Sequence, residues 1–156
     1  MPLGRQTETL HAIAERLHQP PLRQIVAKPG VSEGFRVTVF YATGEPGSVA
    51  TLINSRGGKC AMTVVYDKRS RPEQFDLALS VERYQKLMDA LRGHKFDRLD
   101  DQPNLPYSAN LWLLERASGS FFRDVLVAPE SAAGSHAGLV EALRDHVPEA
   151  VRALTV

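Results

Sequence analysis

The chain has 156 residues, of which 43% are apolar and 24% are charged, as is typical of a water-soluble globular domain. Nineteen basic residues against eighteen acidic ones leave a formal net charge of +1, so no overall positive field would attract a nucleic acid or an anionic membrane. The single cysteine excludes an intrachain disulfide and any multi-cysteine metal site, and it is compatible with a reducing cytoplasm.

The N-terminal stretch 1–19 has no uninterrupted apolar core of about 7–15 residues, so we expect no signal peptide. No apolar run approaches the roughly 20 residues that span a bilayer. We therefore expect a cytoplasmic protein with no membrane segment, and a single domain over 1–156.

An amphipathic helix is predicted over about 7–18. Its apolar residues recur at the spacing of one helix face: Leu10, Ile13, Ala14 and Leu17. Thr7 or Thr9 is available as the N-cap. Pro20 and Pro21 end the helix, because proline cannot continue the hydrogen-bond ladder.

Four short strands are predicted over about 35–80, joined by tight connections into an antiparallel meander. In the first strand, Arg36 and Thr38 alternate with apolar residues, which predicts one buried face and one polar face. The stretch SRGGKC contains Gly57 and Gly58, which predict a hairpin turn between strands 49–54 and 60–66.

The second half continues with a helix over about 81–92, with Ser80 as N-cap and Gly93 as the left-handed residue after its end. Phe96 and Leu99 are expected to pack under the sheet. A hairpin follows over about 110–128, and its first strand is apolar on both faces, which indicates either a central strand or a bulged one. A last helix is predicted over about 136–147. The fold class is α+β, one antiparallel sheet of about six strands in the order α-ββββ-α-ββ-α.

SRGGKC also invites comparison with a phosphate-binding loop, G-x-x-x-x-G-K-[ST]. Aligning Gly58 and Lys59 puts Ile53 in place of the first glycine and Cys60 in place of the hydroxyl residue. A strand follows instead of a helix, so no helix dipole would face a phosphate. We expect Cys60 to be a buried core residue, although the adjacent lysine could activate it as a nucleophile.

Two groups of residues are candidates for chemistry. His11, Glu15 and His18 recur along one flank of the first helix, and such ligands suit zinc, but the same spacing is typical of a solvated helix edge, which is the interpretation we favour. A second group lies in one loop and could perform acid–base catalysis or bind a divalent cation: His94, Asp97, Asp100 and Asp101.

Two weaker patterns are present in the sequence. Ser131, Ser135 and His136 offer a nucleophile and a base without the surrounding nucleophile-elbow motif. Basic residues occupy two predicted turns, Arg56 and Lys59 in one and Lys68, Arg69 and Arg71 in the other. The strand between these turns separates them by roughly 23 Å. We therefore expect no continuous patch for a nucleic acid.

From residue 60 to about 150 the features have a distinctive order. A strand leads into the serine-capped helix of LALSVERYQKLMDAL, KFDRL follows, and LWLLE forms a W-x-x-E strand with Trp112 and Glu115. This order resembles that of small bacterial proteins of uncharacterised function. The resemblance implies a fold and no catalytic residues. Those proteins are often exported, whereas this chain shows no exporting segment.

The layout of an N-terminal helix, an antiparallel sheet, an inner helix and a C-terminal helix is similar to that of type III secretion chaperones, which dimerise and hold an effector segment. Those chaperones are usually acidic, whereas this chain is near neutral with an extra strand. We expect a non-enzymatic, chaperone-like module that binds a protein partner or forms a homodimer, without a cofactor. The alternative is a small enzyme that uses the His94 to Asp101 loop, with or without the assistance of a bound metal.

Overall fold

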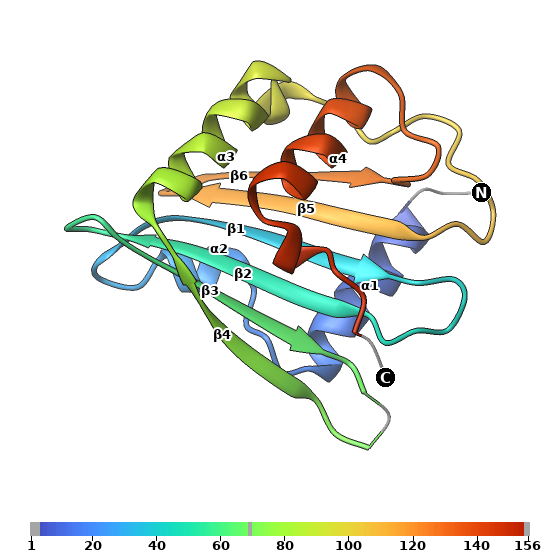
Figure 1. The fold of residues 1–156 in the computed structure, drawn as a ribbon, viewed down its shortest axis with the longest axis horizontal. Helices are drawn as coiled ribbons and strands as arrows, with labels where there is room; N and C mark the ends of the chain where they lie inside the picture. The colour runs from blue at the N-terminus through green and yellow to red at the C-terminus, as the bar shows by residue number, and fades with distance from the viewer. Residues whose placement is uncertain (1–3, 69, 155–156) are drawn as a thin grey trace.

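The computed structural model describes residues 4–68 and 70–154, and it confirms the α+β fold with one antiparallel sheet (Figure 1). The helices are α1 (Gly4–Arg16), α2 (Leu22–Val26), α3 (Val81–Gly93) and α4 (Gly134–His146), with 3-10 turns η1 (Phe96–Arg98) and η2 (Pro148–Ala150). The strands are β1 (Val31–Phe40), β2 (Ser48–Ser55), β3 (Lys59–Tyr66), β4 (Glu73–Leu79), β5 (Leu111–Ser118) and β6 (Phe121–Val127). They lie in the order β4-β3-β2-β1-β5-β6.

Helices cover the sheet on both sides (Figure 1). α3 and α4 pack on what we call the front face, where the main core joins the two helices to the sheet. α1 and α2 pack on the back face, over three smaller apolar clusters. Leu10 and Ile13 of α1 are buried there, as the helical spacing predicted, and Leu22 and Val26 of α2 are buried beside them.

The prediction of a polar, half-open face for β1 is wrong. Val37 and Val39 face the main core as expected, but Arg36 and Thr38 on the other face are also buried. The reason is tertiary: α1 and α2 cover the back of the central strands. Period-two alternation identifies the two faces of a strand, but it does not reveal which other elements pack on them.

Several boundaries differ from the sequence prediction. α1 begins at Gly4, so neither Thr7 nor Thr9 caps it. The short helix α2 was not predicted, and β1 begins at Val31 instead of near residue 35. The left-handed residue after α3 is Lys95, with φ 59°, while Gly93 is the last helical residue. Arg69, one of the basic residues singled out, lies outside the described residues.

Other local predictions are confirmed. The Ser80 side chain accepts a hydrogen bond of 3.1 Å from the Arg83 backbone amide at the start of α3. Gly57 and Gly58 have φ angles of 92° and 80°, and they form the β2–β3 hairpin turn. β5 lies between β1 and β6, as expected for a strand that is apolar on both faces.

Candidate functional site

The four loop residues proposed for acid–base chemistry point to different partners. The His94 ring lies against Gly138 of α4. Asp97 pairs with Arg116, while the Asp100 side chain is 99% exposed. Asp101 accepts a hydrogen bond of 2.8 Å from the Leu126 backbone amide. The structure therefore does not bring the four side chains together around one substrate position.

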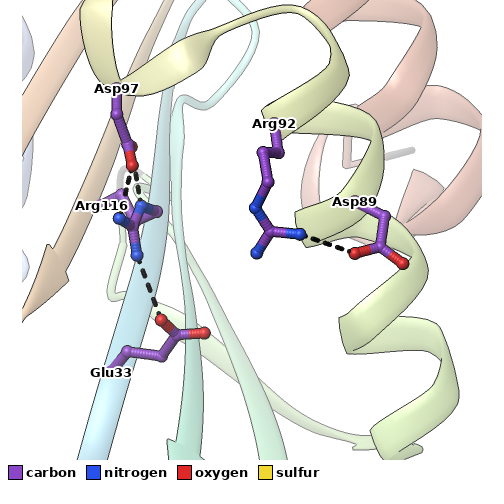
Figure 2. A network of polar contacts seen from close by, with 5 residues as sticks. All are labelled: Glu33, Asp89, Arg92, Asp97 and Arg116. Carbon is purple, nitrogen blue, oxygen red and sulfur yellow. Dashed lines mark hydrogen bonds and ion pairs between the residues drawn. The ribbon is translucent and has the colours of Figure 1, made fainter.

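Arg116 on β5 is the centre of an ion cluster (Figure 2). Its guanidinium donates two hydrogen bonds to the Asp97 carboxylate, at 2.8 and 2.6 Å, and a third to Glu33 at 3.1 Å. The bonds to Asp97 raise the pKa of the Arg116 guanidinium. Arg116 and Arg92 of α3 line one hollow of about 260 Å³. Arg92 pairs with Asp89 of the same helix at 2.9 Å (Figure 2). All three guanidinium nitrogens of Arg116 are engaged, so the cluster holds η1 against the sheet.

The proposed metal ligands do not form a cluster. His11, Glu15 and His18 are exposed, and His18 has left the helix, with φ 56°. Within residues 4–68 and 70–154, no three His, Cys, Asp or Glu side chains gather in a way that could hold a metal ion. His11 and Glu15 instead line a cavity beside α1.

The serine–histidine group is also dispersed. Ser131 Oγ accepts a hydrogen bond of 3.1 Å from Gln102 Nε2, and the His136 ring lies 2.7 Å from the Asp100 carbonyl oxygen. Ser135 is exposed at the start of α4. The arrangement contains no nucleophile–base contact.

Cys60 is partly buried, not a full core residue as expected, because it lies next to the turn at the end of the β2–β3 hairpin. Its thiol donates a weak hydrogen bond to Asn54 Oδ1 at 3.6 Å. Burial raises the pKa of this thiol, and the nearby Glu33 carboxylate raises it further. A raised pKa lowers the thiolate fraction, which is the opposite of what a nucleophile needs.

A row of polar residues crosses the back face of the sheet. Pairing in register places one residue of each strand in the row, in the order Asp76, Thr63, Thr51, Arg36, Glu115 and Asp124. The apolar clusters under α1 and α2 lie on either side of this row. The two helices therefore leave a polar strip between them, and a cavity of about 250 Å³ opens there.

Two ionisable groups of the row line this cavity, and both are buried. Arg36 is 2% exposed and Glu115 is 6% exposed. Burial raises the pKa of the Glu115 carboxyl, although Arg36 and His11 oppose the shift. Burial also lowers the pKa of Arg36. Sequence reasoning missed both residues as a site, although an ionisable residue inside a strand that is apolar on both faces is a recognisable signal.

The two edges of the sheet differ. Along β6 the loop 99–102 supplies backbone and side-chain partners to the outer edge. The Gln102 amide donates to the Leu126 carbonyl at 2.9 Å, Asp101 accepts from Leu126, and Gln102 Oε1 accepts from the Ala128 amide at 2.9 Å. Along β4 the one outer contact of the described chain is a long hydrogen bond, 3.5 Å, from Arg83 to the Ala78 carbonyl.

An apolar hollow of about 310 Å³ lies beside the open edge, on the front face. Phe75 and Leu77 of β4 line it together with Val64 and Tyr66 of β3 and the C-terminal Leu154. The Phe75 ring is 38% exposed and stands edge-on to Tyr66, with ring centroids 5.9 Å apart. α3 and α4 do not cover this part of the sheet (Figure 1).

Comparison with known proteins finds no protein-family model and no curated protein that matches this chain. Among the described residues, no helix has both the length and the apolar character to cross a bilayer. The assignment of a function therefore depends on the geometry of the edges and the cavities.

Proposed function

We propose that this protein is a cytoplasmic, non-enzymatic binding module that holds an extended segment of another protein along β4. The observation that supports the proposal is the difference between the two sheet edges. Loop 99–102 pairs the outer backbone groups of Leu126 and the amide of Ala128 at the C-terminal end of β6, whereas β4 presents its outer backbone groups beside an apolar hollow. An open edge is a template for an additional strand, and a pocket for alternate side chains supplies specificity.

The charges on β4 indicate what the added segment carries. Phe75 and Leu77 face the front hollow, and Asp76 between them faces the back. Lys68 pairs with Glu73 at 2.9 Å, but the partners of Asp76 are the neutral side chains of Thr63 and Gln74. A complementary segment therefore has apolar residues facing Phe75 and Leu77 and a basic residue opposite Asp76.

A second copy of the chain fits this edge less well. In the antiparallel register that would pair Phe75 of one copy with Leu77 of the other, Asp76 would lie opposite Asp76. Like charges directly opposite one another destabilise a strand pair. We therefore favour a different protein as the partner over a homodimer.

A peptide of defined sequence tests whether β4 binds such an extended segment. We would measure fluorescence anisotropy of a labelled peptide of about nine residues that alternates valine and lysine, long enough to cover the seven residues of β4. We expect a Kd on the order of 100 μM or tighter. Binding should be lost when glutamate replaces lysine, and when the backbone nitrogens on one edge of the peptide are methylated.

Two phenylalanines provide a matched pair of variants. Phe75 on β4 and Phe121 on β6 are each 38% exposed on an edge strand. Phe75→Ser should weaken peptide binding at least about tenfold, and Phe121→Ser should leave it unchanged. Equal effects of the two variants, equal binding of the lysine and glutamate peptides, or a wild-type dimer that Phe75→Ser dissociates would each overturn the proposal.

The enzyme alternative receives no support from the geometry. The loop that it depends on has Asp97 and Asp101 engaged in structural contacts and Asp100 in solvent. No observation favours it as a second candidate.

A further inference from the structure

The cavity between α1 and α2 has the features of a ligand site. It measures about 250 Å³ and lies on the back face, away from the front hollow beside β4. Pockets for drug-sized ligands measure about 300–1,000 Å³, so this one suits a smaller molecule. Its two most buried charged residues, Arg36 and Glu115, face each other directly across the β1–β5 pair.

Arg36 has a hydrogen-bond donor to spare. Its Nε donates to Thr51 Oγ1 at 3.1 Å and its Nη1 donates to the Pro20 carbonyl at 2.7 Å. These contacts hold the guanidinium in one place. The remaining nitrogen, Nη2, is buried and has no partner among the described residues. A buried donor without a partner costs free energy unless something else satisfies it.

The Glu115 carboxylate carries the charge opposite to that of Arg36, and it has no hydrogen-bond or ion-pair partner among the described residues. Its side chain makes neither a hydrogen bond nor an ion pair within the described part of the chain, not even with Arg36. Two charged residues of opposite sign, each less than a tenth exposed, thus line one cavity without a hydrogen bond or ion pair between them. A buried charge is normally paired and hydrogen-bonded, so the pair lacks a bridging group.

The other two charged side chains that line the cavity are again one carboxylate and one guanidinium. Glu15 on α1 adds a carboxylate, and Arg23 on α2 adds a guanidinium that lies over the Phe122 ring, 4.4 Å from its centroid. An anion alone would meet the two carboxylates, and a cation alone would meet the two guanidinium groups. A ligand with one charge of each sign satisfies both. Leu22 and Phe122 give the cavity an apolar wall as well.

We propose that this cavity binds a small zwitterion of the α-amino acid class. The ligand carboxylate accepts from Arg36, the ligand ammonium donates to Glu115, and an apolar side chain lies against Leu22 and Phe122. The site is independent of the β4 edge, since it lies on the other face and shares no lining residue with the hollow beside β4.

Isothermal titration calorimetry on the full chain tests this with three forms of each common apolar L-amino acid. The free amino acid carries both charges, the N-acetyl form carries the negative charge alone, and the amide carries the positive charge alone. We expect at least one free amino acid to bind at least about tenfold more tightly than its two derivatives. Amide chemical shifts in ¹⁵N NMR should change around Arg36 and Glu115.

If Glu115 binds the ligand ammonium, Glu115→Gln should change which form of the ligand binds best. A purely structural role of Glu115 would not produce that change. The substitution removes the partner of the ammonium but keeps the size of the side chain. The free amino acid should lose at least about tenfold in affinity, and the N-acetyl form should become the better ligand. Asp124→Asn is the matched control, because Asp124 lies beside Glu115 in the polar row but not in the cavity lining. Asp124→Asn should change neither the affinity for the free amino acid nor the affinity for its N-acetyl form.

Four results would overturn the inference. The first two are the absence of binding by any free amino acid up to about 10 mM and an equal affinity for the three forms of the ligand. The third is a Glu115→Gln variant that still prefers the free amino acid to the N-acetyl form. The fourth is a set of chemical-shift changes that lie away from α1, α2 and Arg36. None of these results depends on peptide binding at β4, so the two proposals succeed or fail separately.

Discussion

Gln102 provides the sharpest test of how the β6 edge is satisfied. Its Oε1 accepts from the buried Ala128 amide at 2.9 Å, and its Nε2 donates to Ser131 Oγ at 3.1 Å. Gln102→Ala removes both bonds. It leaves the Ala128 N–H buried without a partner, which costs about 1–3 kcal/mol, and the bond to the more exposed serine adds less.

The sum is a loss of about 2 kcal/mol in the free energy of unfolding. For a chain of this length, that corresponds to a melting temperature lower by about 4–8 °C. Urea denaturation followed by tryptophan fluorescence measures the first quantity, and differential scanning calorimetry measures the second. Opening the edge should also produce concentration-dependent association, which sedimentation velocity would detect.

Asp100→Ala is the control from the same loop. The Asp100 side chain is 99% exposed and its contact with Arg123 is 3.4 Å long, so its removal should leave the melting temperature unchanged. If Gln102→Ala and Asp100→Ala gave the same melting temperature, the edge would not depend on the side chain of Gln102. The contrast between the two edges would then rest only on the contacts that Leu126 makes with Asp101 and the Gln102 backbone.

Three further predictions follow from single side chains. Burial raises the pKa of the Glu115 carboxyl above its ordinary value of 4.5, so protonation of this group favours the folded state. That stabilisation is fully present below pH 4.5, and it is lost as the pH rises through the folded-state pKa. Glu115→Gln should therefore match the wild type in acid urea denaturation and exceed its stability at neutral pH; a constant difference across pH would contradict this. Cys60 should react with Ellman's reagent more slowly than a free thiol at neutral pH and reach the free-thiol rate in urea, because its thiol pKa is raised in the folded protein. Gly138→Ala should lower the melting temperature because the new methyl group would overlap the His94 ring, and His94→Ala in the same chain should restore it; simple additivity of the two effects would refute that contact.

Local signals in the sequence were sufficient for most of the fold. Ser80 predicted the start of α3 because a serine side chain satisfies a free amide at a helix N-terminus. Gly57 and Gly58 predicted the hairpin because they adopt positive φ at no steric cost. The apolar spacing of β5 predicted an internal strand. Each of these predictions depends on neighbours within a few positions in the chain, and such interactions can be read from the residues alone.

The candidate sites could not be predicted in the same way. Asp97 and Asp101 look alike in the sequence, yet one pairs with Arg116 and the other caps the edge of β6, because strands that follow later in the chain decide which partner lies nearby. Arg36 and Glu115 are 79 positions apart, and only the β1–β5 register makes them neighbours. Their burial required α1 and α2 to close over the back of the sheet.

By itself, therefore, the sequence determined the order of helices and strands, the turns and the apolar faces, since short-range periodicity and backbone preferences dictate these features. The tertiary structure decided which charged residues are buried together, which outer backbone groups of the sheet are paired by a loop and which edge stays open. Those outcomes depend on pairing and packing between segments distant in the chain, and the proposed functions follow from them.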